Sequence, residues 1–515
     1  MADRVTTVIL TLALAGTVAC GSGKKKQQSG DPAPKPGNGE AKPPVTPPAP
    51  SVVVGVAQPK QFNYVYGKGK KAYERADKAA VPKSGEPDWA AVAAACEEAL
   101  AADADHLDAA FLLARARVET GKAAAVAEPL SQALAGDYLA FAPALAEAPW
   151  PAFFASEAGA PVKAKVDAIA QSFLDRAKSG LFVVARRTSF RPPKPKSRVQ
   201  WAATRAELYS YDRETERYLR ITHTNHSLAG WLMAPSGDEL VYVAYSGVKV
   251  GADGQPSLLG WPKIGVIDMD SLEPRTKEAR VKGTPRRISV GYRAGDELVV
   301  ETAAADGRWA ASNPKTWVLD RGKGRLKKSD VPLDAADVLR VDYDRVRLSR
   351  AQSPDVQAEA EATSFRLLPT NITVVMPAGE VVGADGYYWS PDKVHLVVRT
   401  MPNPCEDQRE STLYLIDAAT GKLKNILRGV ASFETRWVDN DHFVYEDDDG
   451  ALRLYDVEER TQVGRLEIKG GIGLTGVAAG RGPVCTDPTS AVDPGLDTAG
   501  ADEEAPPEGD EGPQP

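Results

Sequence analysis

The chain has 515 residues, of which 43% are hydrophobic, and a net charge of −7. This length is too great for one compact core, so at least two folded units are expected. Residues 481–515 hold nine acids against one base and contribute −8, which leaves the rest of the chain near neutral. A near-neutral body lacks the clustered basic face that replaces counterions on phosphates, so no nucleic-acid partner is expected.

Residues 1–19 are predicted to be a signal peptide. The apolar run at 5–19, VTTVILTLALAGTVA, is too short to span a bilayer as a helix. It ends in TVACG at 17–21, which resembles the lipobox of bacterial lipoproteins, with threonine where an aliphatic residue is usual. The resemblance implies that Cys20 is lipidated and holds the protein on a membrane. Gly21 in the next position resembles lipoproteins of the outer membrane; a conventional cleaved signal and a soluble exported protein form the alternative.

Residues 20–60 are predicted to be a disordered tether. From Gly21 to Lys60 this segment holds nine prolines and six lysines, with almost no large apolar residue. Such a composition cannot bury enough surface to offset the entropy of ordering, and its prolines favour extended conformations. The segment is therefore interpreted as a spacer between the anchor and the folded body.

Residues 61–180 are predicted to form a small helical domain, because Ala and Leu recur there with helical spacing. Residues 103–137, DADHLDAAFLLARARVETGKAAAVAEPLSQALAGD, resemble a tetratricopeptide repeat with Gly121 at the turn between its helices. Residues 64–100 are a candidate degenerate copy. The small residues are interpreted as packing residues, and the domain either as a docking platform for the next domain or as a peptide-binding surface.

Residues 181–478 are predicted to be an all-β propeller of about six blades. Five apolar strands end in an aspartate followed by a short turn: Asp212, Asp268, Asp320, Asp417 and Asp456. These aspartates lie 56, 52, 97 and 39 residues apart, so the long interval predicts one degraded blade near 340–375. We expect each carboxylate to cap the following turn through backbone amides.

A second repeated pattern is an aromatic residue followed by a polar turn and a hydrophobic strand, with copies that begin at Trp231, Tyr292, Trp389 and Trp437. The sequence Trp-Ser-Pro-Asp-Lys at 389–393 is close to Trp-Ser-Pro-Asp-Gly, so the region resembles the six-bladed, WD40-like propellers of TolB-like proteins. Pro391 and Asp392 are expected to set a hairpin turn, and the aromatic residues to pack between blades.

Residues 479–515 are predicted to be an acidic disordered tail, with an electrostatic docking segment as the alternative. The chain has four cysteines, and Cys20 is already assigned to lipidation. Cys96 lies in an Ala-rich helical run and is expected to be a small core residue. The sequence leaves open whether Cys405 and Cys485 form a disulfide.

No catalytic, cofactor or metal site is predicted. His223 and His226 form the only close histidine pair, and no neighbouring carboxylate or thiol completes a metal set. The run DDDG at 447–450 is interpreted as a hairpin turn rather than a calcium loop. The sequence has no Gly-x-Ser-x-Gly elbow, phosphate-binding loop or dinucleotide fingerprint, so we expect no enzyme activity.

The expected function is that of a non-enzymatic, membrane-anchored lipoprotein of the bacterial envelope that mediates protein-protein contacts through its propeller and helical module, on the periplasmic or outer side of the outer membrane. The alternatives are a propeller receptor for a small molecule or glycan, and a propeller hydrolase. The TolB-like resemblance implies association with envelope proteins, at the level of fold analogy. A propeller that binds a small molecule or glycan would show converging polar groups in a pocket, and a propeller hydrolase would show paired carboxylates.

Overall fold

The computed structural model describes most of the chain between residues 52 and 474. The described ranges are 52–59, 67–186, 201–202, 206–224, 226–250, 256–259, 262–283, 285–306, 310–342, 346–350, 353–359, 361–400, 411–430, 435–447, 451–468 and 472–474. The expected signal peptide, Cys20, most of the expected tether, the acidic tail, Cys405 and Cys485 lie outside these residues.

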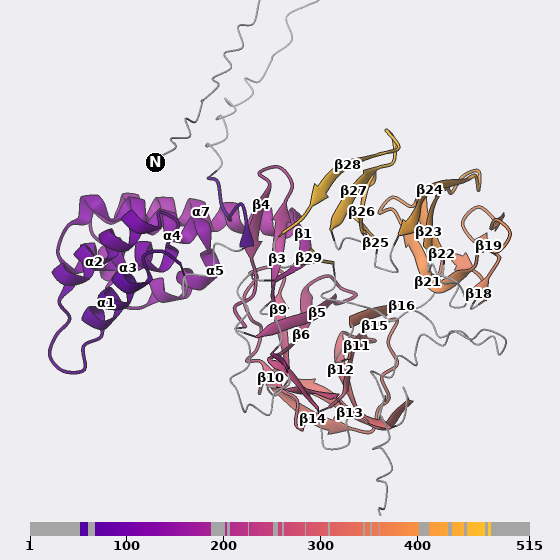
Figure 1. The fold of residues 1–515 in the computed structure, drawn as a ribbon, viewed down its shortest axis with the longest axis horizontal. Coiled ribbons are helices and arrows are strands. Elements are labelled where there is room, and N and C mark those ends of the chain that lie inside the picture. Colours follow the sequence, from indigo (N-terminus) through magenta and orange to yellow (C-terminus); the bar gives the residue numbers. More distant parts are fainter. Residues whose placement is uncertain are drawn as a thin grey trace, which may run out of the picture. The chain divides into compact units, whose positions relative to one another are not determined.

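The first part of the described chain is helical. It contains α1 (Lys70–Ala80), α2 (Trp89–Ala102), α3 (Leu107–Glu119), α4 (Ala127–Gly136), α5 (Tyr138–Phe141), α6 (Trp150–Phe154) and α7 (Ala160–Ser179), with short 3-10 turns at Ala123–Ala125 and Ala142–Ala146. Figure 1 shows these helices side by side, with α7 leading into the β region. None of the helices in the described part of the chain is long and apolar enough to cross a bilayer.

Local sequence signals explain where these helices begin and how they pack. The carboxylate of Asp88 caps α2 by accepting a hydrogen bond from Ala91 N at 3.0 Å. Gly121 adopts a φ of 71° between α3 and α4, which is the turn expected at this glycine. Cys96 is fully buried in α2, where burial raises the pKa of its thiol to about 12. A buried thiol of this kind packs as a small apolar group.

The rest of the described chain consists of short strands. They are β1 (Leu181–Arg186), β2 (Trp201–Ala202), β3 (Ala206–Asp212), β4 (Arg217–Arg220), β5 (Ser227–Met233), β6 (Glu239–Tyr245), β7 (Gly247–Val250), β8 (Pro256–Leu259), β9 (Lys263–Asp268), β10 (Ala279–Arg280), β11 (Arg287–Arg293), β12 (Glu297–Asp306), β13 (Ala310–Asp320), β14 (Arg325–Ser329), β15 (Asp337–Asp342), β16 (Val346–Arg350), β17 (Val356–Gln357), β18 (Glu361–Ala362), β19 (Ser364–Leu367), β20 (Ile372–Val375), β21 (Val382–Trp389), β22 (His395–Thr400), β23 (Ser411–Asp417), β24 (Leu423–Val430), β25 (Thr435–Trp437), β26 (His442–Glu446), β27 (Leu452–Asp456), β28 (Thr461–Leu466) and β29 (Ile472–Gly473).

Most of these strands form four-stranded antiparallel meanders. In the described residues the meanders are β29-β1-β3-β4, β5-β6-β9-β10, β11-β12-β13-β14, β21-β22-β23-β24 and β25-β26-β27-β28. Such a meander is the blade unit of a β-propeller. The expected fold class, a small helical domain followed by an all-β propeller region, is confirmed.

The segment between the third and the next complete meander is irregular. There β15 and β16 extend the sheet of β11, β17 pairs with the β19–β20 hairpin, and β18 pairs with β21. This is the stretch in which the spacing of the aspartates predicted a degraded blade. The last described strand, β29, pairs with β1 through Ala185 and Ile472, so it completes the first sheet of the β region.

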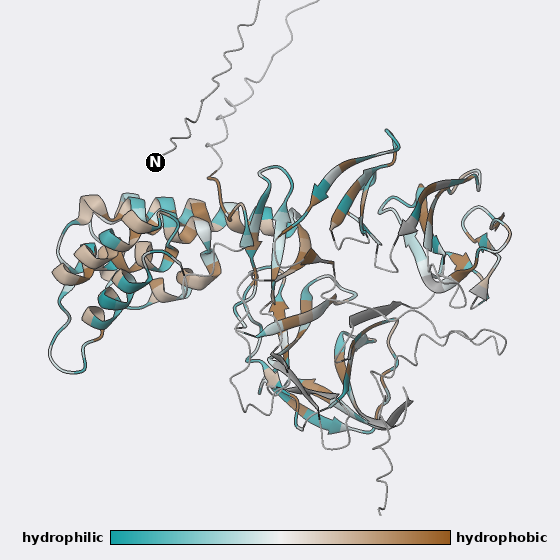
Figure 2. Ribbon diagram, viewed as in Figure 1, coloured by the Kyte–Doolittle hydropathy of each residue, from teal (hydrophilic) through white to brown (hydrophobic). Residues whose placement is uncertain are grey.

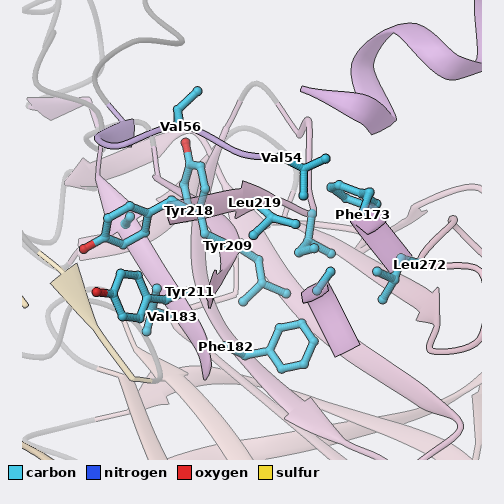
Figure 3. Close-up of a cluster of buried hydrophobic side chains, with 14 of the residues drawn as sticks. Val54, Val56, Phe173, Phe182, Val183, Tyr209, Tyr211, Tyr218, Leu219 and Leu272 are labelled. Carbon is cyan, nitrogen blue, oxygen red and sulfur yellow. The ribbon is translucent and has the colours of Figure 1, made fainter. Parts of the chain in front are cut away.

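The largest hydrophobic core runs from the helices into the first sheet. Figure 3 shows Phe173 of α7 near Leu219 of β4, together with Tyr209 and Phe182 from β3 and β1. Figure 2 colours the ribbon by hydropathy: hydrophobic segments occur in both the helices and the strands, whereas β14 is largely hydrophilic. The helices and the first sheet therefore bury one continuous apolar surface.

The expected boundary of the tether at residue 60 is wrong for residues 52–59. Val54 and Val56 are buried in the main core, and Val56 forms a β-bridge with Tyr218. The run SVVVGV has enough β-branched side chains to bury, but the surrounding prolines dominate the average composition of the tether. We call residues 52–59 the N-terminal strap.

Candidate functional site

The contact between the helical domain and the first sheet contains the densest buried polar cluster that the structure describes. We call this contact the seam; it is formed by α4, α5 and α7 on one side and by β3, β4 and the residues after β4 on the other. Arg176 of α7 donates a hydrogen bond to Asp212 Oδ2 at 2.8 Å, and Ser210 Oγ donates to Ala177 O at 2.7 Å. The two domains are thus joined by polar contacts as well as by a shared core.

An ion cluster lies in the interior of the seam. Arg220 at the end of β4 contacts Glu207 Oε1 at 3.1 Å and Asp137 Oδ2 at 3.3 Å. Glu207 belongs to β3, whereas Asp137 lies between α4 and α5, so one guanidinium connects the two domains. All three side chains are at most 7% exposed. A buried charge is tolerated only when it is paired and hydrogen-bonded, which is the case here.

The other carboxylate oxygen of Glu207 is also bound. Thr222 Oγ1 donates to Glu207 Oε2 at 2.7 Å, and the backbone N and Oγ1 of Thr224 donate to the same oxygen at 3.1 and 3.2 Å. Burial alone would lower the pKa of Arg220, but the carboxylates of Glu207 and Asp137 together raise it. The Arg220 guanidinium is therefore held in its charged form inside the seam.

His223 extends this cluster toward solvent. Its Nε2 lies 2.9 Å from Asp137 Oδ1, and its side chain is 29% exposed. The structure thus gives His223 a carboxylate partner from the helical domain, which the sequence had not indicated. In the described residues, no three His, Cys, Asp or Glu side chains are arranged to hold a metal ion. The cluster has the chemistry of a structural joint.

The five strand-ending aspartates occupy equivalent places in five meanders. Asp212, Asp268, Asp320, Asp417 and Asp456 end the third strands β3, β9, β13, β23 and β27. Their Oδ1 atoms accept hydrogen bonds from backbone amides of the next turn: Glu214 N at 3.1 Å, Ser271 N at 2.9 Å, Lys323 N at 3.2 Å, Thr420 N at 2.8 Å and Glu458 N at 2.8 Å. The repeated carboxylates thus fix the turns between third and fourth strands.

Hydrogen bonds from side chains and backbone amides hold the pKa of several of these aspartates below its ordinary value. For Asp212, burial alone would raise the pKa, but hydrogen bonds from Thr215 and Arg176 outweigh it. For Asp417, bonds from the hydroxyl and the backbone of Thr420 lower the pKa. Asp212 is thus bound both by its own turn and by Arg176 of α7, whereas Asp417 is bound by its own turn.

The three predicted tryptophans each reach the preceding unit of the chain. Trp437 Nε1 donates to Tyr388 O at 2.8 Å, and Trp389 Nε1 donates to Ser353 Oγ at 3.1 Å. Trp231 Nε1 donates to Leu474 O, next to β29 in the first sheet, at 2.7 Å. These contacts place an indole ring at three boundaries between neighbouring units.

Pro391 and Asp392 lie in the turn between β21 and β22. Asp392 Oδ1 accepts hydrogen bonds from Ser390 Oγ at 2.6 Å and Val394 N at 3.1 Å. Lys393, which stands where the family pattern has glycine, adopts a φ of 60°. In the equivalent turn after β5 the residue in this conformation is Gly237, with a φ of 76°. The glycine position is therefore conserved in conformation between the two blades, although not in residue type.

A second buried ion cluster, not predicted from the sequence, lies between two blades. The Glu239 side chain is 1% exposed and contacts Arg275 Nη1 at 2.8 Å and Arg321 Nη2 at 2.5 Å. The hydrogen bond with Glu239, and after it the hydrogen bond with Asp268, raises the pKa of Arg275.

A short sequence repeat accompanies these contacts. Arg321 directly follows Asp320 in the sequence and contacts Glu239 of another blade. In the same way, Arg213 directly follows Asp212 and pairs with Asp439 at 2.7 Å. The repeated Asp-Arg dipeptide was therefore the available signal for contacts between blades.

Comparison with known proteins adds structural similarity of low identity. TolB from Acinetobacter baumannii is 12% identical, covering 62% of this chain and 72% of TolB, with a TM-score of 0.31. A putative 6-phosphogluconolactonase from Bacteroides uniformis is 10% identical, covering 57% of this chain and 99% of that protein, with a TM-score of 0.30. At these values the similarity concerns the fold alone, and the activity of neither protein is carried over. No protein-family model and no curated protein matches the sequence.

Proposed function

We propose that the protein is a non-enzymatic, lipid-anchored protein of the bacterial cell envelope that binds protein partners through its helical domain and propeller region together. The observation that carries this proposal is the seam. A continuous core and a buried ion cluster hold the helical domain against the first sheet, so that a partner meets both domains as one surface. Such a platform suits a scaffold that positions other proteins.

The chemistry of the described residues supports binding rather than catalysis. The buried carboxylates of Glu207 and Glu239 are both neutralised by arginines and used to join structural units. The repeated aspartates are likewise engaged by backbone amides of their own turns. A general acid or base needs a carboxylate that faces a substrate, and these groups face other parts of the protein.

The anchor in this proposal rests on the sequence around Cys20. Acylation of that thiol after cleavage of residues 1–19 would place the body at a membrane, with residues 21–51 between the lipid and the N-terminal strap. Gly21 after the cysteine favours the outer membrane. The periplasmic or outer side of that membrane is then where partners are met.

The test is crosslinking in intact cells of the bacterium that encodes the protein. Wild type and Cys20→Ala are each recovered with their crosslinked companions, and mass spectrometry reads the N-terminus of each bait. The proposal expects acyl chains on Cys20, a defined set of envelope proteins with the wild type, and loss of that set with the variant. An unmodified Cys20, or recovery of no protein with the wild type, would refute it.

A matched pair of variants tests whether partner binding depends on the seam. Arg220→Ala removes the guanidinium that connects Asp137 and Glu207, whereas Arg75→Ala removes an exposed pair with Glu98. If both domains act as one surface, Arg220→Ala lowers recovery of the partners and Arg75→Ala does not. Equal recovery with the two variants would show that the joint is irrelevant to binding.

A further inference from the structure

The N-terminal strap lies against the seam, with a left-handed turn at Gly55, and is held through its main chain. Val56 N donates to Tyr218 O of β4 at 3.0 Å, and Tyr218 N donates to Val56 O at 2.8 Å. On the other side, Gly55 N donates to Ala135 O of α4 at 2.6 Å. The strap is therefore bound between a strand of the first sheet and a helix of the helical domain.

Two side chains complete the binding of the strap backbone. Arg217 Nη1 donates to Gly55 O at 2.9 Å, and Ser172 Oγ of α7 donates to Val52 O at 2.7 Å. With the three backbone bonds, this gives main-chain contacts at Val52, Gly55 and Val56. Bonds to main-chain groups do not depend on the side chains of the segment that they hold.

The two valines on either side of Gly55 are buried, and Val53 before them faces solvent. Val54 is fully buried and Val56 is 6% exposed, whereas Val53 is 53% exposed. Figure 3 shows Val54 close to Phe173 and Leu219, and Val56 beside Tyr218. Two buried valines and the main-chain bonds to β4 and α4 therefore hold the strap by the same kinds of contact with which proteins recognise a bound peptide.

Gly55 makes the groove selective for a glycine at this position of the bound segment. It adopts a φ of 82°, and a Cβ atom at this position would lie 2.8 Å from the backbone oxygen of Tyr218. Any other residue would meet both the strain of a left-handed conformation and a clash with a backbone atom that cannot move aside. The site therefore fits a segment of the form Val-Gly-Val, with the first and last valines buried.

We propose that the seam is a peptide-binding groove, that the N-terminal strap is its resident ligand, and that the groove takes a Val-Gly-Val segment of a protein partner, with the same turn at the glycine, when the strap leaves. The inference deepens the proposed function by naming the site and the partner chemistry, and it rests on that function for the existence of a protein partner. The groove itself is testable without any partner.

The strap is part of the same chain as its groove, so a competing segment must be present at high concentration or bind more tightly. A ligand joined to its site by a short linker is present at an effective concentration in the millimolar range, so a free peptide displaces it only in excess. Displacement removes contacts to α4, α7 and β4 at once. The strap thus links occupancy of the groove to the joint between the domains.

The experiment uses the full chain with a protease site introduced between Lys60 and Gly67, cleaved only after purification in the folded state. Circular dichroism before and after cleavage checks that the body stays folded. Gel filtration then reports whether the N-terminal fragment remains bound. The synthetic peptide SVVVGVAQ, which copies residues 51–58, is added as the competitor, and the same peptide with Gly55→Ala is the matched control.

The proposal expects the fragment to co-elute with the body after cleavage and to be released by millimolar SVVVGVAQ. The Gly55→Ala peptide is expected to be at least about tenfold weaker, because its Cβ meets the Tyr218 oxygen. Immediate loss of the fragment, release by both peptides alike, or unfolding on release would each overturn the groove. If the crosslinking experiment failed, the proposed function would be refuted, but the result of the peptide-exchange experiment would still stand.

Discussion

The ion cluster of the seam and the cluster around Glu239 are built with opposite proportions of charge. In the seam, one guanidinium, that of Arg220, serves the two buried carboxylates of Glu207 and Asp137. Between the blades, two guanidiniums, those of Arg275 and Arg321, serve the single buried carboxylate of Glu239. In both clusters the central residue pairs with both of its neighbours. Removal of Arg220 leaves two carboxylates without this guanidinium, whereas removal of Glu239 leaves two guanidiniums without this carboxylate.

The two clusters differ in whether the charged groups left behind can reach water. Arg275 and Arg321 are 32% and 35% exposed, so water can take the place of Glu239 for each of them. Asp137 and Glu207 are at most 3% exposed and have no such access. The seam should therefore be much more sensitive than the blade boundary to the loss of its central charge, because an unpaired buried charge is costly.

The largest effect is expected for Arg220→Ala. The variant leaves two carboxylates buried without their cation, and we expect the free energy of unfolding to fall by about 3–5 kcal/mol. Urea unfolding of the full chain measures this loss. The exposed pair of Arg75 with Glu98 provides the control, since Arg75→Ala should change stability by less than about 1 kcal/mol. Equal losses in the two variants would contradict the comparison.

A smaller effect is expected for Glu239→Gln. The amide keeps an acceptor for one arginine, and the partly exposed guanidiniums regain water, so the expected loss is about 1–2 kcal/mol. The same urea experiment tests it against Arg220→Ala. A loss as large as that of Arg220→Ala would mean that the blade boundary is as closed to water as the seam.

The dependence of stability on pH distinguishes the carboxylates by their surroundings. The folded-state pKa of Asp212 is lowered, so its contribution is fully present above the unfolded pKa and is lost as pH falls through the folded value. The loss should occur below about pH 4, where an unperturbed aspartate titrates. Stability measured from pH 7 to pH 3 should fall less steeply in Asp212→Asn than in the wild type. Parallel curves would show that Asp212 does not contribute to acid sensitivity.

The smallest effect is expected for Trp437→Phe. This change keeps most of the ring and removes the hydrogen bond from Nε1 to Tyr388 O, which should cost about 1 kcal/mol. Thermal unfolding measures the shift, and Trp437→Ala serves as the comparison because it removes the ring as well. If the phenylalanine variant lost as much as the alanine variant, the hydrogen bond rather than the ring would hold this boundary.

The repeated aspartates show what could be predicted from the sequence. Each of Asp212, Asp268 and Asp417 ends a strand and binds the next turn through contacts two or three residues away. Such a contact is local, so the residue and its turn can be recognised together in the sequence. The order of helical and β regions followed in the same way from periodicity, which also reflects neighbouring residues.

The seam shows what could not be predicted. Arg220 meets Glu207 from a neighbouring strand, but Asp137 comes from a different domain, and no local pattern joins them. The N-terminal strap was missed for a related reason: its few valines lie among prolines, and their burial depends on α4, α7 and β4. Contacts between distant segments depend on the folded arrangement, so composition and spacing alone do not reveal them.

The pairing of β29 with β1 has a consequence for the order of events in biogenesis. The first sheet gains its last strand only from the far end of the β region, through Ala185 and Ile472. During synthesis, one edge of β1 therefore stays unpaired until nearly the whole β region has been made. Contacts of such long sequence separation form slowly, and open strand edges invite misassociation. The newly made chain is therefore exposed to misassociation at this edge until β29 pairs with β1.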